Sequence, residues 1–305
     1  WGPKKVIDRL RATEPATRWP ADSTAGEILK RAGLVKPRVT RRRVAPDSQP
    51  FGDCRQANQS WSADFKGDFR LGDGRRCYPL TISDNHSRFL FQCRGLHRTG
   101  NAAVQPWFEW VFREYGLPQA MRTDNGAPFA SLAVGGISAL SKWWIQLGIR
   151  PERIRPGTPS QNGRHERMHR TLKEATLEPP AASLAAQQRQ FDAFIDEYNW
   201  ERSHEALGRK TPGSLHRHSS RPYPSRILPV EYDSAFTVRR VRHNGEIRWQ
   251  GQLLYVSGVL AKERIGLKPV DEGQWEVCYS FHKLGILDNR TGKITPAKHW
   301  HSSDK

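Results

Sequence analysis

The sequence predicts a mixed α/β core, preceded by a short helical segment and followed by a small all-β domain. Three strand candidates follow one another after residue 60, and strands then alternate with amphipathic helices up to about residue 200. After about residue 218 the helical spacing of apolar residues disappears, and only short strand candidates remain. Consecutive strands followed by strands that alternate with helices are typical of a mixed α/β sheet.

The composition indicates a folded protein with a polyanionic partner. The 305 residues are enough for two or three domains, and 36% of them are hydrophobic. The net charge is +18, and basic residues outnumber acidic ones in every part of the chain: 12 to 5 over 1–50, 23 to 17 over 51–218, and 14 to 9 over 219–305. A solubilising surface would explain an excess of charge, but this even distribution favours nucleic acid as a polyanionic partner.

Several classes of protein are excluded or disfavoured. No run of about 18 apolar residues and no secretory segment is visible, so we expect a soluble, intracellular protein without a membrane partner. The cysteines form no CxxC pair, and no His or Cys precedes Cys54, which excludes an N-terminal zinc domain within this chain. The chain begins at Trp1 rather than Met, as a fragment would.

The first 36 residues predict two short helices. Residues 2–13 carry apolar residues on one helical face, and prolines then interrupt the helix. Thr24 is a candidate cap for a second helix, with Glu27 three residues later as its capping-box partner. A basic stretch follows and contains Arg41, Arg42 and Arg43. This order favours a helix-turn-helix with a DNA-contacting linker, although a small helical cap followed by solvated charges would show the same pattern.

The elements of the core follow from periodicity and turn residues. The segments "WSADFKGDFRL", "CYPLTIS" and "RFLFQC" are strand candidates, followed by a helix over 101–115 and the short strand "QAMRT". A helix over 138–147, a short strand over 149–154 and a helix over 182–200 follow. Beyond residue 218, Gly-containing turns separate short strands, which predicts a small barrel with a basic strand bearing Arg239, Arg240 and Arg242.

Three carboxylates stand out from this pattern. Asp64 lies inside an otherwise apolar strand, where a charge is costly unless it is paired or binds a cation. Asp124 follows a strand, at the kind of edge where active sites of open α/β sheets lie. Glu166 lies in a basic helix that we expect to begin near Thr158 or Gln161. Taken singly, each has an ordinary explanation, as a turn residue or as a surface ion pair with Arg170.

Together with their surroundings, these residues resemble a known superfamily. The order Asp64, "DNG" at Asp124 and "TPSQNGRHERMHRTLK" around Glu166 is similar to the DDE transposases and retroviral integrases, which have an RNase H-like core. The segments "TISDNHSRFLF" and "YNWERSHEALGRKTPGSL" match further parts of that core, and the flanking segments also fit. The resemblance covers nearly the whole chain and is greatest to bacterial insertion-sequence transposases of the integrase-like type.

The resemblance implies the fold of each part and the boundaries between the parts. It implies a helix-turn-helix over 1–36, a basic linker over 37–55, an RNase H-like core with a five-stranded mixed sheet over 56–218, and an SH3-like β-barrel over 219–305. One departure concerns spacing, because 41 residues separate Asp124 from Glu166, more than is usual in the family. We expect the excess to lie around 131–138 as a surface loop, which would not move the sheet.

The resemblance also implies two-metal-ion chemistry on DNA. Asp64 would contact both of two Mg²⁺ ions, Asp124 one and Glu166 the other, and Mn²⁺ can substitute for Mg²⁺. Water would be the nucleophile for cutting an element end, and the freed 3′-OH would be the nucleophile for joining it to target DNA. No small-molecule cofactor is implied. Because two DNA ends must be joined, a homodimer or homotetramer on DNA is expected, in the bacterial cytoplasm at the nucleoid.

The basic residues around Glu166 predict how DNA is held. At helical spacing Glu166, His169, Arg170 and Lys173 share one face, and Arg164 lies just before them. These cations would contact phosphates beside the scissile bond, with Met168, Leu172 and Ala175 anchoring the helix to the core. A solvated basic helix is the alternative. Two other functions remain open: an end-binding relic that no longer cuts, and an RNase H-like nuclease.

Overall fold

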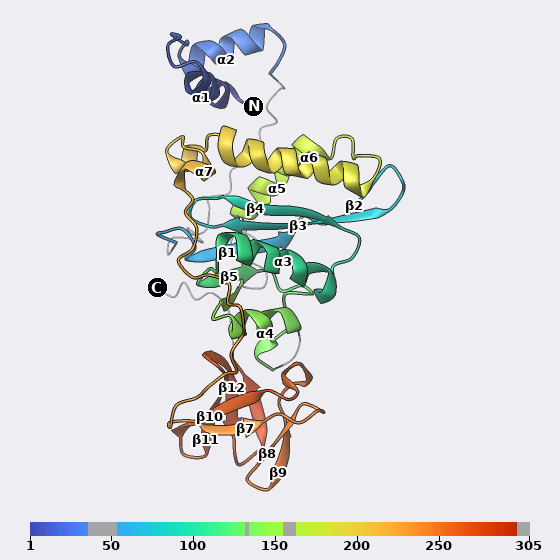
Figure 1. Ribbon diagram of the computed structural model, residues 1–305, viewed down its shortest axis with the longest axis vertical. Coiled ribbons are helices and arrows are strands. Elements are labelled where there is room, and N and C mark those ends of the chain that lie inside the picture. Colours follow the sequence, from blue (N-terminus) through green and yellow to red (C-terminus); the bar gives the residue numbers. More distant parts are fainter. Residues whose placement is uncertain (36–53, 132–133, 155–162, 298–305) are drawn as a thin grey trace.

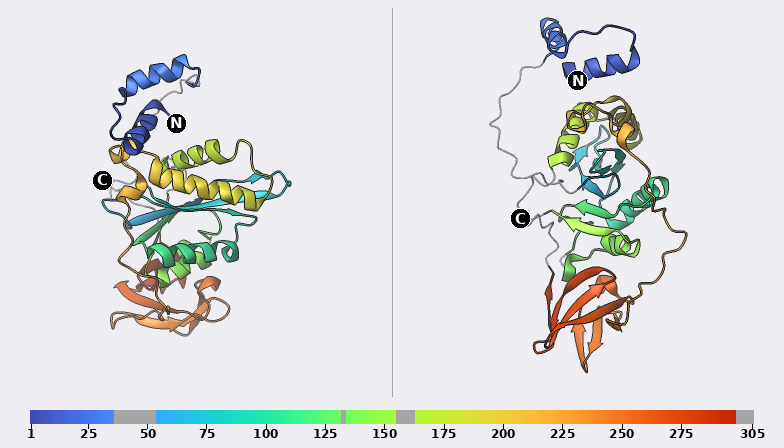
Figure 2. Two further views of the ribbon diagram at one scale, coloured as in Figure 1. Left: turned by 45° about the horizontal axis from the view of Figure 1, so that its top comes forward. Right: turned by 90° about the vertical axis from the view of Figure 1, so that its left-hand side faces the viewer.

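The computed structural model describes residues 1–35, 54–131, 134–154 and 163–297, without the side chains of residues 163 and 164. Three parts follow one another along the long axis: two N-terminal helices, a layered α/β core and a C-terminal β part (Figures 1 and 2). The element types expected for all three parts are therefore present.

The core contains a mixed sheet, as the sequence predicts. Its strands are β1 (Ser60–Phe65), β2 (Phe69–Arg70), β3 (Arg76–Asp84), β4 (Leu90–Leu96), β5 (Ala120–Thr123) and β6 (Arg150–Arg153). Strands β4, β3 and β1 form an antiparallel meander, and β5 and then β6 continue the sheet parallel to β1. Six strands are present rather than five, because the segment predicted as one strand is interrupted after Phe65 and resumes as β2, which pairs with the first residues of β3 in the same antiparallel sense.

Helices cover both faces of this sheet (Figure 1). Helices α3 (Asn101–Tyr115) and α4 (Ala139–Gln146) lie on one face, and α5 (Gly163–Thr176) and α6 (Leu184–Asp196) lie on the other. Trp61 of β1 and Trp144 of α4 belong to the hydrophobic core on the first face. Leu90 of β4 and Leu172 of α5 belong to the core on the second. Buried side chains of the strands therefore pack either against α3 and α4 or against α5 and α6. The face on which a candidate acid lies decides which of these helices it can contact.

Three short elements complete the core after α6. They are a π-helical turn η3 (Glu197–Glu201), a 3₁₀ turn η4 (Glu205–Leu207) and the short helix α7 (Pro212–Leu215). Asn199 of η3 binds the backbone of Leu90, with 2.9 Å from its Oδ1 to the Leu90 nitrogen and 2.9 Å from its Nδ2 to the Leu90 oxygen. The side-chain amide thus satisfies both backbone groups of Leu90 and fixes this segment to β4.

The N-terminal part consists of α1 (Pro3–Thr13) and α2 (Asp22–Arg31), which we call the N-terminal unit. Two helices are present where two were predicted, but the predicted cap is wrong. Helix α2 begins after Ala21 with no side-chain cap, and Thr24 lies inside it. Asp22 at the first turn accepts hydrogen bonds from Arg209, and its charge suits a helix N-terminus. This long-range pair replaces the local capping box.

Ion pairs fasten the N-terminal unit to the core. Arg209, which follows η4, binds the carboxylates of both Asp8 and Asp22, and Ser203 donates to Asp8 at 2.6 Å. Arg9 pairs with Glu201 at 3.1 Å. The hydrogen bonds that Arg209 donates to Asp8 and Asp22 raise the pKa of its guanidinium, which therefore stays protonated. Arg209 is therefore the centre of this attachment.

Replacing Arg209 with Ala is expected to loosen the N-terminal unit from the core. The change leaves two carboxylates on α1 and α2 without their shared cation. Amide hydrogen exchange in α1 should become faster, and 1 M salt should have the same effect on the parent protein by screening the pairs. Arg18→Ala, a change at an exposed residue of the same unit, serves as the control and should leave exchange in α1 as it is in the parent.

The C-terminal part is an open sheet and a separate hairpin, not the closed barrel that the turn residues predict. The sheet contains β7 (Thr237–Arg240), β10 (Arg264–Asp271), β11 (Gln274–Tyr279), β12 (His282–Asp288) and β13 (Lys293–Pro296), and the hairpin contains β8 (Glu246–Trp249) and β9 (Gln252–Tyr255). Within the described residues β13 and β7 are the two edges of the sheet, and no ladder joins them. Apolar side chains of both pieces still share one core.

The segment around 131–138 is more than the surface loop that the sequence predicts. Its turn η1 (Val134–Gly136) lies against β12, and a Cβ added to Gly135 would come within 3.0 Å of the Leu284 backbone. Ile137 is only 1% exposed and belongs to the hydrophobic core of the C-terminal part. The extra residues between the second and third acids therefore join the core to the C-terminal sheet.

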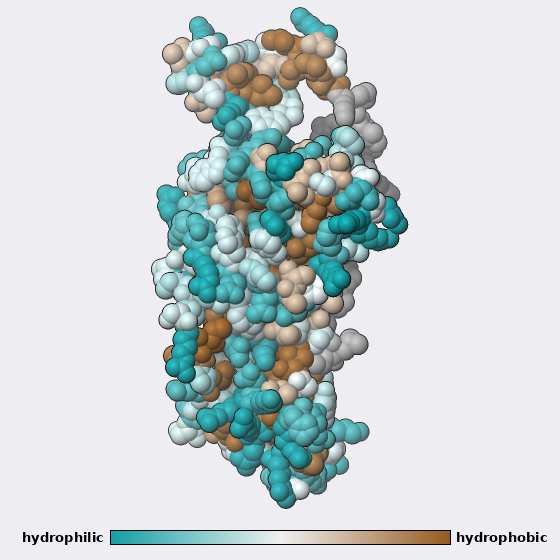
Figure 3. All heavy atoms as spheres, turned by 45° about the vertical axis from the view of Figure 1, so that its right-hand side comes forward, coloured by the Kyte–Doolittle hydropathy of each residue, from teal (hydrophilic) through white to brown (hydrophobic). Residues whose placement is uncertain are grey.

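The surface carries mostly hydrophilic residues on the face shown in Figure 3. Hydrophobic residues appear there in small separate groups, several of them on the N-terminal unit. Ile28 of α2 is 54% exposed, and Leu34 just after it is 71% exposed. No helix among the described residues is long and apolar enough to cross a membrane.

Candidate active site

The register of the sheet brings Asp64 and Asp124 to the same level. Strands β1 and β5 are parallel, and Ser62 lies opposite Arg122. Continuing this register by two residues places Asp124, the residue after β5, beside Asp64. Neighbouring strands are about 4.8 Å apart, and matched positions point to the same face. The register therefore brings positions 64 and 124 to the same level at the carboxyl ends of adjacent parallel strands.

Asp124 is held in a tight turn. Its Oδ1 accepts a hydrogen bond from the Gly126 nitrogen at 3.1 Å. A Cβ at Gly126 would lie 3.2 Å from Asp124 Oδ2, so a larger residue there would crowd the carboxylate. Asn125 donates from Nδ2 to the Ile154 oxygen at 2.9 Å and ties this turn to the end of β6. The "DNG" sequence thus has a structural purpose for each of its three residues.

Helix α5 rests on the sheet through two histidines. The Nε2 atoms of His165 and His169 lie 2.7 and 2.8 Å from Oγ1 of Thr81, which is opposite Asp64 on β3. The same hydroxyl lies 3.0 Å from the backbone oxygen of Asp64 and donates to it. Since a hydroxyl has one proton and two lone pairs, both imidazoles then donate from Nε2. Thr81 therefore links α5 to the strand that carries Asp64.

His169 is not the DNA-contacting cation that the sequence predicts. It is 7% exposed, and it faces the sheet rather than sharing the exposed side of Glu166. Burial, with smaller effects of His165 and Lys66, lowers its pKa to about 2. Burial also lowers the pKa of His165 to about 4, so both rings are neutral at pH 7. His165 and His169 are four residues apart, so the sequence could have shown that they lie on one face of the helix.

Asp64 lies close to the two buried histidines of α5. Among the described residues, the only group of three or more His, Cys, Asp or Glu side chains with ligand atoms within 4.8 Å of one another is Asp64, His165 and His169. Glu166 is exposed and does not belong to this group. The predicted helix start at Thr158 or Gln161 lies outside the described residues, and the described helix begins at Gly163. Neither Asp124 nor Glu166 belongs to this close group.

The donor chemistry of this region fits a hard divalent cation. Two carboxylates from adjacent strands offer the oxygen ligands that Mg²⁺ and Mn²⁺ prefer, and they leave room for water and a substrate oxygen. The two imidazoles use Nε2 to bind Thr81, so they support α5 rather than provide a second donor set. Asp64 and Asp124 are therefore residues that could hold such an ion, and Glu166 is exposed on α5.

The remaining residues predicted to contact DNA are scattered. Arg170 and Lys173 are exposed on α5. Ala175 is also exposed and does not anchor the helix as expected, whereas Met168 and Leu172 are buried. The side chains of Arg41, Arg42, Arg43 and Arg164 lie outside the described residues. In the C-terminal part Arg240 is exposed, Arg242 lies 3.9 Å from Glu246, and Arg239 lies over the Trp249 ring at 5.3 Å.

Replacing Thr81 with Val is expected to destabilise the protein by about 1–3 kcal/mol. The substitution keeps the side-chain shape but removes the acceptor of two buried imidazole N–H groups. The midpoint of thermal or urea unfolding measures the loss. Thr171→Val is the matched control, because that half-buried hydroxyl donates only to the Arg167 oxygen of its own helix. An equal loss in both variants would contradict the role assigned to Thr81.

Comparison with known protein families gives three matches along the chain. Residues 55–159 and residues 147–212 each match an integrase core domain. Residues 236–295 match the C-terminal domain of IS481 family transposases. Together the three matched ranges include Asp64, Asp124 and Glu166, as well as the C-terminal sheet.

Similar proteins come from insertion elements. The chain is 30% identical over 192 residues to an uncharacterized 39.2 kDa protein of insertion element IS476 from Xanthomonas euvesicatoria, covering 62% of this chain and 51% of that protein. It is 29% identical over 190 residues to a 31.7 kDa protein of insertion element IS407 from Burkholderia multivorans, covering 62% and 66%. The chain therefore spans about half to two thirds of the length of these relatives.

Among solved structures, the catalytic core domain of HTLV-2 integrase in complex with magnesium is similar, with 16% sequence identity and a TM-score of 0.43. The likeness covers 53% of this chain and 99% of that structure.

Proposed function

Because the chain belongs to the integrase-like transposases of bacterial insertion sequences, we propose that it cuts DNA at element ends and joins the 3′-OH ends to target DNA. The observation that supports this proposal is the parallel register of β1 and β5, which continued by two residues brings Asp64 and Asp124 to the same level. A polynucleotidyl transferase needs carboxylates that converge from separate elements, and the proposal assigns this role to Asp64, Asp124 and Glu166.

The three acids would hold two divalent cations, which supply Lewis-acid stabilisation of the charge that develops on the phosphate oxygens. Asp64 would serve both ions, Asp124 one and Glu166 the other. The exposed position of Glu166 supports a closing step in which DNA brings α5 nearer the strands. Thr81, His165 and His169 would fix the other side of α5 during that step.

The flanking parts would bind the element ends. We assign residues 1–36 to a helix-turn-helix, 37–55 to a basic linker, 56–218 to an RNase H-like catalytic core and 219–305 to a DNA-binding domain built on the open sheet and the hairpin. Exposed Arg170 and Lys173 would contact phosphates near the scissile bond. The joining of two ends to one target calls for a homodimer or homotetramer on DNA, located at the bacterial nucleoid.

The proposal is tested by incubating the protein with an oligonucleotide of the element end and a plasmid target, with Mg²⁺ or Mn²⁺. Joined products that require the metal are expected. Binding to the end without any product would support an inactive end-binding relic. Degradation of the RNA strand of an RNA–DNA hybrid, without joining, would support an RNase H-like nuclease instead.

A further inference from the structure

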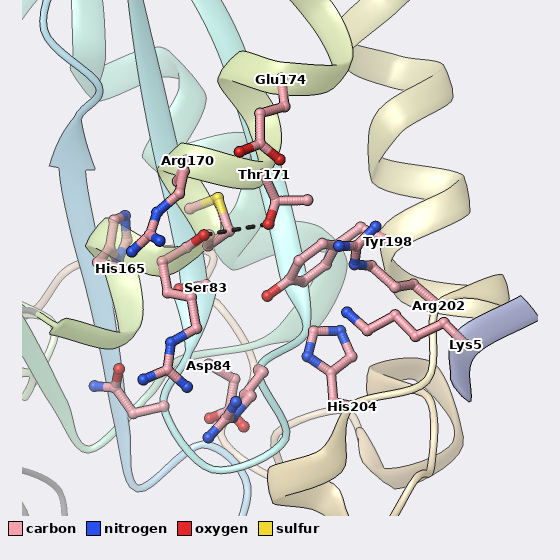
Figure 4. A pocket seen from close by; sticks show the side chains of 14 residues that line it. Lys5, Ser83, Asp84, His165, Arg170, Thr171, Glu174, Tyr198, Arg202 and His204 are labelled. Atoms are coloured by element: carbon pink, nitrogen blue, oxygen red, sulfur yellow. Dashed lines mark hydrogen bonds between the residues drawn. The ribbon is translucent and has the colours of Figure 1, made fainter. Parts of the chain in front are cut away.

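A pocket of about 320 Å³ lies where α1 meets the core beside α5, and we call it the α1–α5 pocket (Figure 4). Its walls come from α1, from the turn after β3, from α5 and from the segment around η3. Five basic side chains line it: Lys5, Arg88, Arg167, Arg170 and Arg202. In Figure 4, Lys5 and His204 lie beside the Tyr198 ring, with Arg202 close by. The pocket thus gathers charges from elements far apart in the sequence.

These charges are poorly neutralised by the pocket itself. The two acids in its lining are Asp84 and Glu174. Asp84 is 1% exposed, and its oxygens accept hydrogen bonds from the Asn58 nitrogen and from the nitrogen and hydroxyl of Ser87. Glu174 is exposed. Among the described residues, only one of the five cations forms an ion pair: Arg202 lies 3.8 Å from Glu197. The pocket therefore has a surplus of positive charge.

Two of the cations are half-buried, which makes this surplus costly. Burial lowers the pKa of Lys5, and the charge of Arg202 lowers it further, against the opposing charges of Glu205 and Glu197, which do not line the pocket. Burial also lowers the pKa of Arg88, against an opposing contribution from Tyr198 and with a smaller one from Arg167 in the same direction. Cations that are removed from water and crowded by like charges stabilise a bound anion strongly, because the anion offsets both effects.

His204 supplies an unused polar atom to the same space. It is 9% exposed, and its Nε2 is buried without a hydrogen-bond partner. Burial, followed by the charge of Lys5, lowers its pKa to about 3, so the ring is neutral in the empty pocket. A buried ring nitrogen of this kind calls for a ligand that shares a proton with it. A phosphate monoester can do this, because its second proton is lost only near pH 6.

We propose that the α1–α5 pocket binds a phosphate monoester, contributed either by free inorganic phosphate or by the terminal phosphate of a DNA strand. Lys5 and Arg88 contact its oxygens, and one proton is shared between the phosphate and Nε2 of His204. The volume exceeds that of a phosphate alone and leaves space for the sugar of a terminal nucleotide. The ligand would also join α1 to α5 and so connect the N-terminal unit with the helix of Glu166.

The test measures binding directly, by isothermal titration of the full chain without divalent cations. The ligands are inorganic phosphate and two single-stranded oligonucleotides of the same sequence, one with a 5′-phosphate and one with a 5′-hydroxyl. Lys5→Gln and Arg88→Gln should each weaken binding of phosphate about tenfold, as expected for loss of a charge-assisted contact. Lys4→Gln is the matched control, because Lys4 pairs with Glu205 and does not line the pocket.

A second readout is the nitrogen-15 shift of the His204 ring, which should move when phosphate is added. Tighter binding of the 5′-phosphorylated oligonucleotide, lost in Lys5→Gln, would identify a DNA end as the source. Binding of inorganic phosphate with no preference between the oligonucleotides would identify the free ion. Phosphate binding that is absent, or unchanged in both pocket variants, would overturn the proposal. Since no metal is present, none of these results depends on whether the chain cleaves DNA.

Discussion

Asp64→Asn is expected to abolish DNA joining while the protein still folds and binds the element end. Asn keeps the shape of the side chain but removes the charge that would hold both cations, at a strand position beside Asp124. Loss of a group that stabilises developing charge lowers rates by a factor of about 100–1,000, and loss of a shared metal ligand should reach at least the upper figure. Quantified joined product in Mg²⁺ measures the effect.

Asp68→Asn is the control for this experiment. Asp68 lies four residues further on, is exposed at a turn and pairs with Arg76 on the outside of the sheet. It should join DNA at the parental rate. Undiminished product from Asp64→Asn would show that the metal site lies elsewhere. Loss of end binding together with joining would instead place Asp64 in the DNA-contacting surface.

Much of the core could be predicted because its signals are local. Alternation and turn residues placed the strands of "CYPLTIS" and "RFLFQC" as β3 and β4. The "DNG" turn predicted that Asp124 follows a short strand. The parallel register of β1 and β5, which only the structure shows, then brings position 124 to the level of position 64. Features set by one short stretch of chain are the ones that sequence patterns can reveal.

The errors concern choices made by distant residues. His169 has the right spacing to share a face with Glu166, yet it lies on the buried side of α5, where it binds Thr81 of β3. Thr24 fits a capping box, yet Arg209 fixes the start of α2 at Asp22. Ile137 belongs to a segment that looks like a loop, yet the C-terminal sheet buries it. Helical periodicity reports which residues share a face but not which partner covers that face.

The second large expected effect is a loss of stability when Arg122 is replaced, because this residue also depends on a partner in another strand. This residue of β5 is 4% exposed, and its Nη2 lies 3.0 Å from Oε2 of Glu152 on β6. The pair lies next to Ser62 in the register, two residues before the candidate acid Asp124. It therefore joins the two parallel strands directly beneath the place where the carboxylates would hold metal.

Arg122→Ala is expected to cost about 3 kcal/mol of the free energy of unfolding, because it removes the buried cation that pairs with the nearly buried Glu152 carboxylate. Arg150 is also bonded to Oε1 of Glu152 at 2.9 Å and keeps the cost near the lower end of the range for buried pairs. Urea unfolding measures the loss. Arg150→Ala removes a cation that is 61% exposed and should cost less than about 1 kcal/mol.

The double variant Arg122→Met with Glu152→Gln removes both buried charges at once. It therefore distinguishes the cost of a buried carboxylate that has lost this cation from the loss of the ion pair itself. If the cost of Arg122→Ala comes from an uncompensated carboxylate, the double variant should recover most of the lost stability, because no buried charge remains. It should still join DNA more slowly, since the turn that holds Asp124 loses the rigid pairing of β5 with β6. Equal stability of Arg122→Ala and Arg150→Ala would contradict this account, and would mean that the buried pair contributes no more than the exposed one.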